Sequence, residues 1–177
     1  MELISIYSKR KYNSLHMCGI LFCKSSKVTS NSFKNAAGMM IHRGPDNLGY
    51  HYFNDVKMSH NRLSIIDLDK RSNQPFKIDS FSIIFNGEIY NYKELIKEHN
   101  LFVITASDTE VLLRMYIKYG SKCLTFLNGM FSFIIYNEIT EDIFVARDRL
   151  GIKPLYFYKK GSEIILSSEI SPIRALK

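Results

Sequence analysis

Long apolar stretches are missing from this sequence of 177 residues. No segment approaches the run of about 18 apolar residues that a transmembrane helix needs. Residues 1–15 include Lys9, Arg10 and Lys11 but lack the apolar core of a secretory signal. Internal repeats and linkers rich in proline or glycine are also missing. The sequence therefore predicts one domain, long enough to bury a sizeable core.

Cysteine is scarce, and its three positions are Cys18, Cys23 and Cys123. An odd number of cysteines does not indicate a disulfide framework, so we expect a reducing compartment and a cytoplasmic location. Cys23 lies in an apolar strand-like segment and Cys123 in a helical turn. Both are interpreted as buried small hydrophobic residues.

Metal-ligand spacing is missing as well. Cys18 and Cys23 stand alone, without the second close pair of ligands that a structural zinc site requires. His42, His51 and His60 show no ligand spacing and are interpreted as structural. We therefore predict no metal site.

Concentrated positive charge is missing too, although the formal net charge is +7. The only basic triplet lies at residues 9–11, and the other lysines and arginines are scattered. Without basic patches interleaved with aromatic residues, nucleic acid is not an expected partner.

Hydrophobic periodicity and turn residues predict short strands at both ends of the chain with helices between them. Strands are expected over residues 18–24, 48–53, 56–66, 81–85, 101–104, 130–136, 142–147, 155–158 and 163–168, and a loop over 67–80. Helices are expected from 31 or 32 to 42, over 91–99 and 108–119, and from about 171. We expect Asp108 to cap its helix, and Asn91 with Glu94 to form a capping box. Two packed antiparallel sheets with helices outside would bury every apolar stripe.

Cys18 follows Met17 at the start of the first strand. If Cys18 became the first residue, its thiol and a free α-amine would belong to one residue, and the amine would serve as the base for the thiol. While residues 1–17 remain attached, that nitrogen belongs to a peptide bond and cannot act as a base.

Asn86-Gly87 allows two interpretations. Asn-Gly most often forms a tight turn. Alternatively, the Asn86 amide and the Gly87 N–H are two donors for a tetrahedral oxyanion, which a glycine backbone can approach closely.

Three further charged positions are candidates for binding or structure. Arg62 either binds a carboxylate or forms a surface salt bridge. Asp108 is a helix cap that as a free carboxylate could also bind an ammonium group, so the two would suit an α-amino acid. The segment 147–149, Arg-Asp-Arg, is interpreted as an internal ion-pair network.

Seven segments occur in an order that resembles a known family. They are Met-Cys-Gly-Ile at 17–20, His-Arg-Gly-Pro-Asp at 42–46, Arg-Leu-Ser-Ile at 62–65, Asn-Gly-Glu-Ile-Tyr-Asn at 86–91, Ser-Asp-Thr-Glu at 107–110, Gly-Met-Phe at 129–131 and Arg-Asp-Arg-Leu-Gly-Ile-Lys-Pro-Leu at 147–155. From Met17 onward the chain resembles the glutaminase domain of glutamine-hydrolysing asparagine synthetases. These are class II glutamine amidotransferases, within the N-terminal-nucleophile hydrolases.

The resemblance implies an α+β fold for residues 18–177, a four-layer α-β-β-α sandwich of two antiparallel sheets. It also implies glutamine hydrolysis through a cysteine thioester, with no cofactor for that step. The implied catalytic residues are Cys18, Asn86 and Gly87. The implied glutamine-binding residues are Arg62, Leu63, Ser64, Ile65, Ile66, Asn86, Gly87, Glu88 and Asp108, of which Arg62 holds the α-carboxylate and Glu88 and Asp108 contact the α-amino end.

Residues 1–17 and the missing ATP-binding half depart from this pattern. We expect residues 1–17 to be a leader that is absent from the active form, through a start at Met17 or through cleavage. The Ser-Gly-Gly motif of the synthetase half is absent from the sequence. ATP and Mg²⁺ are therefore expected on a separate domain or partner that makes asparagine from aspartate, and a homodimer is one expected assembly. Two alternatives stay open: a glutaminase domain for another acceptor, and a non-catalytic glutamine sensor if the leader is retained.

Overall fold

Two antiparallel sheets lie face to face in the computed structural model, which describes residues 17–64 and 69–177. The five-stranded sheet has the order β2 (Asn47–Phe53), β3 (Val56–Arg62), β1 (Gly19–Lys24), β9 (Glu163–Ser167) and β8 (Tyr156–Lys160). The four-stranded sheet has the order β4 (Phe76–Ile78), β5 (Phe81–Ile89), β6 (Gly129–Asn137) and β7 (Ile143–Arg147). Residues 1–16 of the predicted leader lie outside the described residues, and Met17 is its one described residue.

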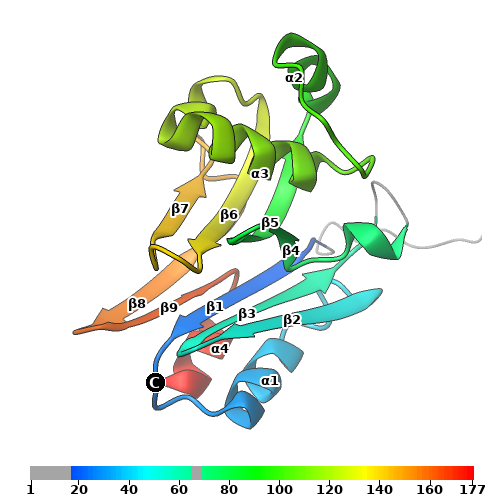
Figure 1. Ribbon diagram of the computed structural model, residues 1–177. Coiled ribbons are helices and arrows are strands. Elements are labelled where there is room, and N and C mark those ends of the chain that lie inside the picture. The colour runs from blue at the N-terminus through cyan, green and yellow to red at the C-terminus, as the bar shows by residue number, and fades with distance from the viewer. Residues whose placement is uncertain (1–16, 65–68) are drawn as a thin grey trace, which may run out of the picture.

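Helices cover the outer face of each sheet (Figure 1). α1 (Ser30–Gly38) and α4 (Ile170–Leu176) lie on the five-stranded sheet. α3 (Asp108–Tyr119) lies on the four-stranded sheet, with α2 (Tyr92–Glu98) beside it. Two short 3₁₀ helices complete the described part, η1 (Lys70–Ser72) and η2 (Gly120–Thr125). The predicted four-layer α-β-β-α sandwich is confirmed.

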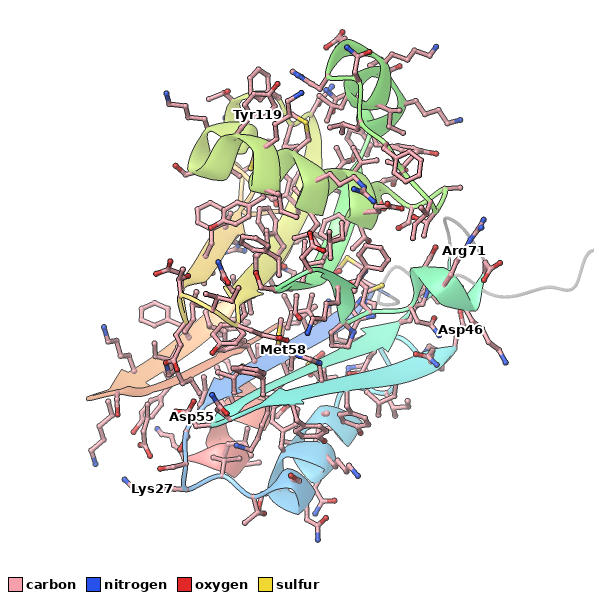
Figure 2. All side chains as sticks on the ribbon, in the orientation of Figure 1. Lys27, Asp46, Asp55, Met58, Arg71 and Tyr119 are labelled. Atoms are coloured by element: carbon pink, nitrogen blue, oxygen red, sulfur yellow. The ribbon has the colours of Figure 1, made fainter. Side chains whose placement is uncertain are left out.

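The central strand β1 explains how one short segment serves two cores. Ile20 and Phe22 belong to the apolar layer between the sheets, whereas Leu21 and Cys23 pack toward α1 and α4. All four side chains are fully buried, because alternate residues of a strand point to opposite faces and both faces are covered here. Figure 2 shows Met58 of β3 within the layer between the sheets.

Strand β5 is longer than expected and corrects one interpretation. The predicted strand ends at residue 85, but β5 continues to Ile89. Asn86 and Gly87 therefore lie within a strand and not in a tight turn. The predicted strand over 101–104 is wrong, because that segment is irregular. The expected loop over 67–80 contains η1 and β4 in its described part.

The helix caps also differ from those predicted. α1 begins at Ser30 with Thr29 as its N-cap and ends at Gly38, four residues before the expected end. The Ser107 side chain caps α3, so Asp108 is its first residue and not its cap. Asn91 makes no side-chain cap for α2, since its amide joins Phe126 and Asn128 instead.

The interpretation of Cys23 and Cys123 as buried small hydrophobic residues is confirmed. Cys23 and Cys123 are buried, and all three cysteines are free thiols. In the described part of the chain, no helix has both the length and the apolar character needed to cross a membrane.

Candidate active site

A pocket opens where β1, β3, β5 and the beginning of α3 meet. Six of the predicted site residues line it: Cys18, Arg62, Leu63, Gly87, Glu88 and Asp108. The other lining residues are His60, Ser72, Gln74, Phe85, Ser107 and Thr109. The two sheets each contribute part of this wall, so segments far apart in sequence form one site.

Cys18 immediately precedes β1, on the same side of that strand as Ile20. Its sulfur accepts a hydrogen bond from the Leu63 N–H at 3.4 Å. Burial raises the pKa of the Cys18 thiol. The Leu63 N–H and the cations Lys153 and Arg62 oppose that rise. The thiol in this environment needs a base before it can act as a nucleophile.

Arg62 ends β3 and is only 6% exposed, so its side chain is buried and does not lie at the open surface. Its Nη1 donates to the Asp69 carbonyl at 3.2 Å and to the Asn73 side chain. The guanidinium therefore lies fixed in the pocket wall, where its fork of donors suits a carboxylate.

The segment 42–46 holds the end of β3 in place. A side chain at Gly44 would lie 2.2 Å from the Asn61 carbonyl, so only glycine lets these backbones touch. The Asp46 N–H donates to the Arg62 carbonyl at 3.0 Å, and its carboxylate accepts the Ser64 N–H at 2.8 Å. Figure 2 shows Asp46 near that end of the five-stranded sheet.

Arg43 connects the same segment to the nucleophile. Its Nε donates to the Cys18 carbonyl at 3.2 Å, and its Nη1 contacts the Glu169 carboxylate at 3.2 Å. His42 also contacts Glu169, which agrees with a structural role for that histidine. The motif at 42–46 thus positions Cys18 and Arg62 together.

The pairing of β5 with β6 decides which way the β5 backbone points. The Tyr90 N–H donates to the Asn128 carbonyl, and the register continues as Glu88 with Met130 and Asn86 with Ser132. In an antiparallel pair, hydrogen-bonded and non-hydrogen-bonded residues alternate. The N–H groups of residues 85, 87 and 89 therefore point away from β6.

These three N–H groups form an edge that β4 does not cover, because β4 pairs only with residues 81–83. The Gln74 side chain accepts the Phe85 N–H at 2.6 Å, and the Asp108 carboxylate accepts the Ile89 N–H at 3.0 Å. Between them, the Gly87 N–H has no partner among the described residues. This donor lies at the pocket and is available to a bound molecule.

Asn86 is 1% exposed and shares its face of β5 with Ile84, in the layer between the sheets. Its Nδ2 is buried and unpaired within the described structure. Asn86 does not line the pocket, unlike its neighbour Gly87. A buried unpaired amide next to an available backbone N–H is consistent with the predicted pair of oxyanion donors, because buried donors are rarely left unpaired without a reason.

Asp108 and Glu88 add negative charge to the pocket that Arg62 also lines. Burial raises the pKa of Asp108 to about 6, the Ile89 N–H opposes this rise, and Glu88 adds to it. A ligand ammonium group would reverse the effect by favouring the ionised carboxylate.

His60 is a pocket residue that the sequence interpretation missed. Its Nε2 lies 3.1 Å from the Phe85 carbonyl, which can only accept, so Nε2 carries the hydrogen. This bond joins the two sheets. Burial lowers the pKa of His60 to about 3, so the ring is neutral and its buried Nδ1 is unpaired in the described part. His60 lies two residues before Arg62 on β3, so both side chains are on one face, which they share with the apolar Val56 and Met58. That spacing was the signal in the sequence that could have placed His60 beside Arg62.

Three predicted binding residues do not add to this geometry. Ile65 and Ile66 lie outside the described residues. Ser64 is described but does not line the pocket, and its N–H binds Asp46. Among residues 17–64 and 69–177, no group of three or more metal-ligating side chains comes together.

The segment 147–155 forms a loop built on backbone contacts. The Asp148 carboxylate accepts N–H groups from Phe131, Leu150, Ile152 and Lys153 at 2.9–3.2 Å. Arg147 donates to the carbonyls of Gly151 and Lys153, both at 2.6 Å. The expected ion-pair network is therefore not what holds this segment, because the Arg147 guanidinium and the Asp148 carboxylate both bind backbone groups.

Comparisons with known proteins agree with this architecture. The family of glutamine amidotransferase domains matches residues 17–177. Glutamine phosphoribosylpyrophosphate amidotransferase from B. subtilis superimposes with a TM-score of 0.76 over 90% of this chain and 43% of that chain, at 19% identity. That level of identity shows the shared fold alone.

Two curated relatives extend the match to sequence. A protein of Methanocaldococcus jannaschii named "putative asparagine synthetase [glutamine-hydrolyzing] 2" is 38% identical over 91% of this chain and 36% of that protein. Glutamine-hydrolysing asparagine synthetase 3 of Bacillus subtilis is 37% identical over 90% of this chain and 28% of that protein. The chain thus spans about a third of their lengths. It belongs to the family of glutamine amidotransferase domains, as a homologue of the glutaminase domain of asparagine synthetases.

Proposed function

We propose that this domain hydrolyses L-glutamine to glutamate and ammonia, with Cys18 as the nucleophile. The observation that carries the proposal is the pocket itself. It brings the Cys18 thiol, the available Gly87 N–H, the Arg62 guanidinium and the Asp108 carboxylate together from both sheets.

The charged side chains that line the pocket suit an α-amino acid. Arg62 is proposed to pair with the α-carboxylate through two parallel hydrogen bonds. Asp108 and Glu88 are proposed to receive the α-ammonium group, which favours their ionised forms. A ligand lacking either group would lose its charged contact with the pocket, so binding should be specific.

The chemical step then requires a base for a thiol whose pKa burial has raised. His60 is unsuited, because its Nε2 already binds Phe85 and its pKa is low. We propose that the base is the α-amine of Cys18, in a form of the protein that begins at this residue. An α-amine has a pKa of about 7.7–8.0, which lets it accept the thiol proton near neutral pH.

The proposed reaction has two stages. The thiolate adds to the side-chain amide carbon, and Asn86 and Gly87 donate to the resulting oxyanion. The protonated α-amine gives its proton to the departing nitrogen, so that ammonia leaves and a thioester remains. Water then adds to the thioester carbon, and glutamate and the free thiol are released.

The acceptor for the ammonia is proposed from the relatives. Because they are asparagine synthetases, we propose that a further domain or partner consumes the ammonia to make asparagine from aspartate, with ATP and Mg²⁺ bound there. Glutamine hydrolysis itself is proposed to need no cofactor. The free cysteines are compatible with a reducing compartment such as the cytoplasm.

The test compares the 177-residue chain with a form that begins at Cys18. Glutamate release is measured for both, together with Cys18→Ala in the shorter form and Cys23→Ala as a control for a buried thiol. We expect turnover only in the form beginning at Cys18, its loss in Cys18→Ala, and its retention in Cys23→Ala. Glutamine binding without turnover in every form would replace the enzyme with a glutamine sensor.

A further inference from the structure

Lys153 is a buried lysine whose role the proposed reaction does not explain. It is 6% exposed, and its Nζ lies 3.0 Å from the sulfur of Met17, the residue bonded to Cys18. Lysine is rarely buried without a partner or a task. Its ammonium group therefore contacts the side chain of the residue that directly precedes the proposed nucleophile.

The loop that carries Lys153 is fixed from both sides. Asp148 accepts the Lys153 N–H at 3.0 Å, and Arg147 donates to the Lys153 carbonyl at 2.6 Å. Gly151 adopts a φ of +64°, a left-handed conformation that suits glycine, where its carbonyl accepts from Arg147. Because the backbone on either side is held, the side chain can be aimed at the site with little freedom.

Charged groups from several elements act on this pair. Lys153 interacts with the Cys18 thiol, with Arg43 from the segment after α1, with Glu88 on β5 and with Asp148 of its own loop. Cys18 also interacts with Arg62 at the end of β3 and with Asp108 at the start of α3. Lys153 and Arg62 favour the thiolate of Cys18, whereas Asp108 opposes it.

We propose that Lys153 is a positioning residue for Cys18, and that its ammonium group stabilises the Cys18 thiolate from the Asp148-organised loop. In a form that begins at Cys18, the contact with Met17 would no longer exist, and the ammonium group would be left next to the nucleophile. This inference rests on the proposed function for its purpose, but the charge effect on the thiol can be measured separately.

The experiment is alkylation of Cys18 with iodoacetamide as a function of pH, on the 177-residue chain. The thiolate displaces iodide, so the rate follows the fraction of thiolate. Cys18→Ala gives the background from the other two cysteines, which are fully buried. We compare the native chain with Lys153→Met, Lys153→Gln and Lys153→Arg, and melting temperatures show that each variant is folded.

Lys57→Met is the matched control. Lys57 is 7% exposed, and its Nζ binds the Ser25 and Asp55 carbonyls. Lys57 lies opposite Cys23 in the pairing of β1 with β3. Cys23 is five residues along the chain from Cys18, a distance of about 17 Å at the usual rise of a strand. The loss of Lys57 removes a buried cation without changing the charge next to Cys18.

Removal of the nearby cation should raise the pH midpoint of alkylation by about one unit in Lys153→Met and Lys153→Gln. The rate near neutral pH should then fall up to about tenfold. Lys153→Arg and Lys57→Met should keep the native midpoint. A folded Lys153→Met or Lys153→Gln protein with the native midpoint would overturn the inference, as would an equal shift in Lys57→Met. If no form hydrolyses glutamine but the midpoint moves as expected, the proposed function fails and the charge effect stands.

Discussion

At the scale of single residues, two adjacent donors define the catalytic part of the proposed site. The Asn86 Nδ2 and the Gly87 N–H both lack partners in the described structure. Leaving a buried donor unpaired costs about 1–3 kcal/mol. An oxyanion that appears only during the reaction would recover that cost in the transition state, where it accelerates the chemistry.

Asn86→Ala should therefore lower kcat for glutamine hydrolysis by about 10²–10³-fold with a much smaller change in KM. Steady-state kinetics on the form beginning at Cys18 measure both constants. Gly87→Ala is not a usable companion, because its added carbon would lie 2.2 Å from the Met130 carbonyl. A fall in kcat below about fivefold would remove Asn86 from the proposed oxyanion site.

The raised pKa of Asp108 predicts that glutamine binding depends on pH. Burial raises its pKa to about 6, so the carboxyl becomes neutral below that pH and cannot pair with an ammonium group. KM for glutamine should rise as the pH falls through about 6, and Asp108→Asn should have a high KM without this dependence. The measurement is KM from pH 5 to 8 in both proteins, and a flat native profile would argue against contact with the ammonium group.

The same carboxyl affects stability in the opposite sense. The folded protein holds the Asp108 proton more tightly than the unfolded chain, where the pKa is about 3.8. The contribution of this group to the free energy of unfolding is thus fully present below pH 3.8 and is lost as the pH rises through about 6. Binding and stability therefore demand different protonation states of one residue, which is typical of a functional site.

At the scale of elements, the loop after β7 depends on one carboxylate. Because Asp148 accepts four buried or half-buried N–H groups, these donors hold its pKa below the usual value although burial opposes this. Asp148→Ala should lower the free energy of unfolding by about 3 kcal/mol, since several donors lose a charged acceptor.

Urea unfolding of Asp148→Ala and of the control Arg149→Ala measures this effect. Arg149 is exposed, and among the described residues its side chain makes one long hydrogen bond, at 3.4 Å to the Leu124 carbonyl, so its loss should cost less than about 0.5 kcal/mol. Equal losses in the two variants would mean that Asp148 does not organise the loop.

The sequence predicted the elements where local pattern decides them. β1 is buried on both faces, so its unbroken apolar run predicts it well. Asn-Gly misled the prediction of β5, because pairing with β6 keeps a dipeptide that favours turns in an extended conformation. Ser107 and Asp108 can both cap a helix, and only the contact of Asp108 with the distant Ile89 N–H decides between them.

The sequence also predicted part of the candidate site. The structure brings Cys18, Arg62, Gly87 and Asp108 together, as the resemblance implied. His60, Gln74 and Lys153 were not anticipated, because their importance comes from contacts with distant backbone or with the residue before Cys18. Such contacts leave no periodic or local signal in a single sequence.

At the scale of the whole molecule, the proposed site joins two sheets that have separate outer cores. A ligand that contacts Arg62 on one sheet and Gly87 on the other binds only the assembled sandwich. Glutamine at 100 times its Kd should therefore stabilise the folded protein by about 2.7 kcal/mol.

Thermal unfolding of Cys18→Ala with and without glutamine measures this without turnover. Glutamate and asparagine serve as comparison ligands, and Arg62→Leu as the variant that should lose most of the shift. Equal shifts with all three ligands, or an undiminished shift in Arg62→Leu, would contradict glutamine binding at this pocket.

The uncovered edge of β5 has a further consequence for the solubility of the protein. Open strand edges recruit other strands and promote aggregation, so proteins usually block them. Here the Gln74 and Asp108 side chains occupy the N–H groups on either side of Gly87 and leave one donor too isolated to start a ladder. The side chains that shape the pocket thus also protect the edge, and mutations that weaken them would be expected to promote self-association as well as to impair binding.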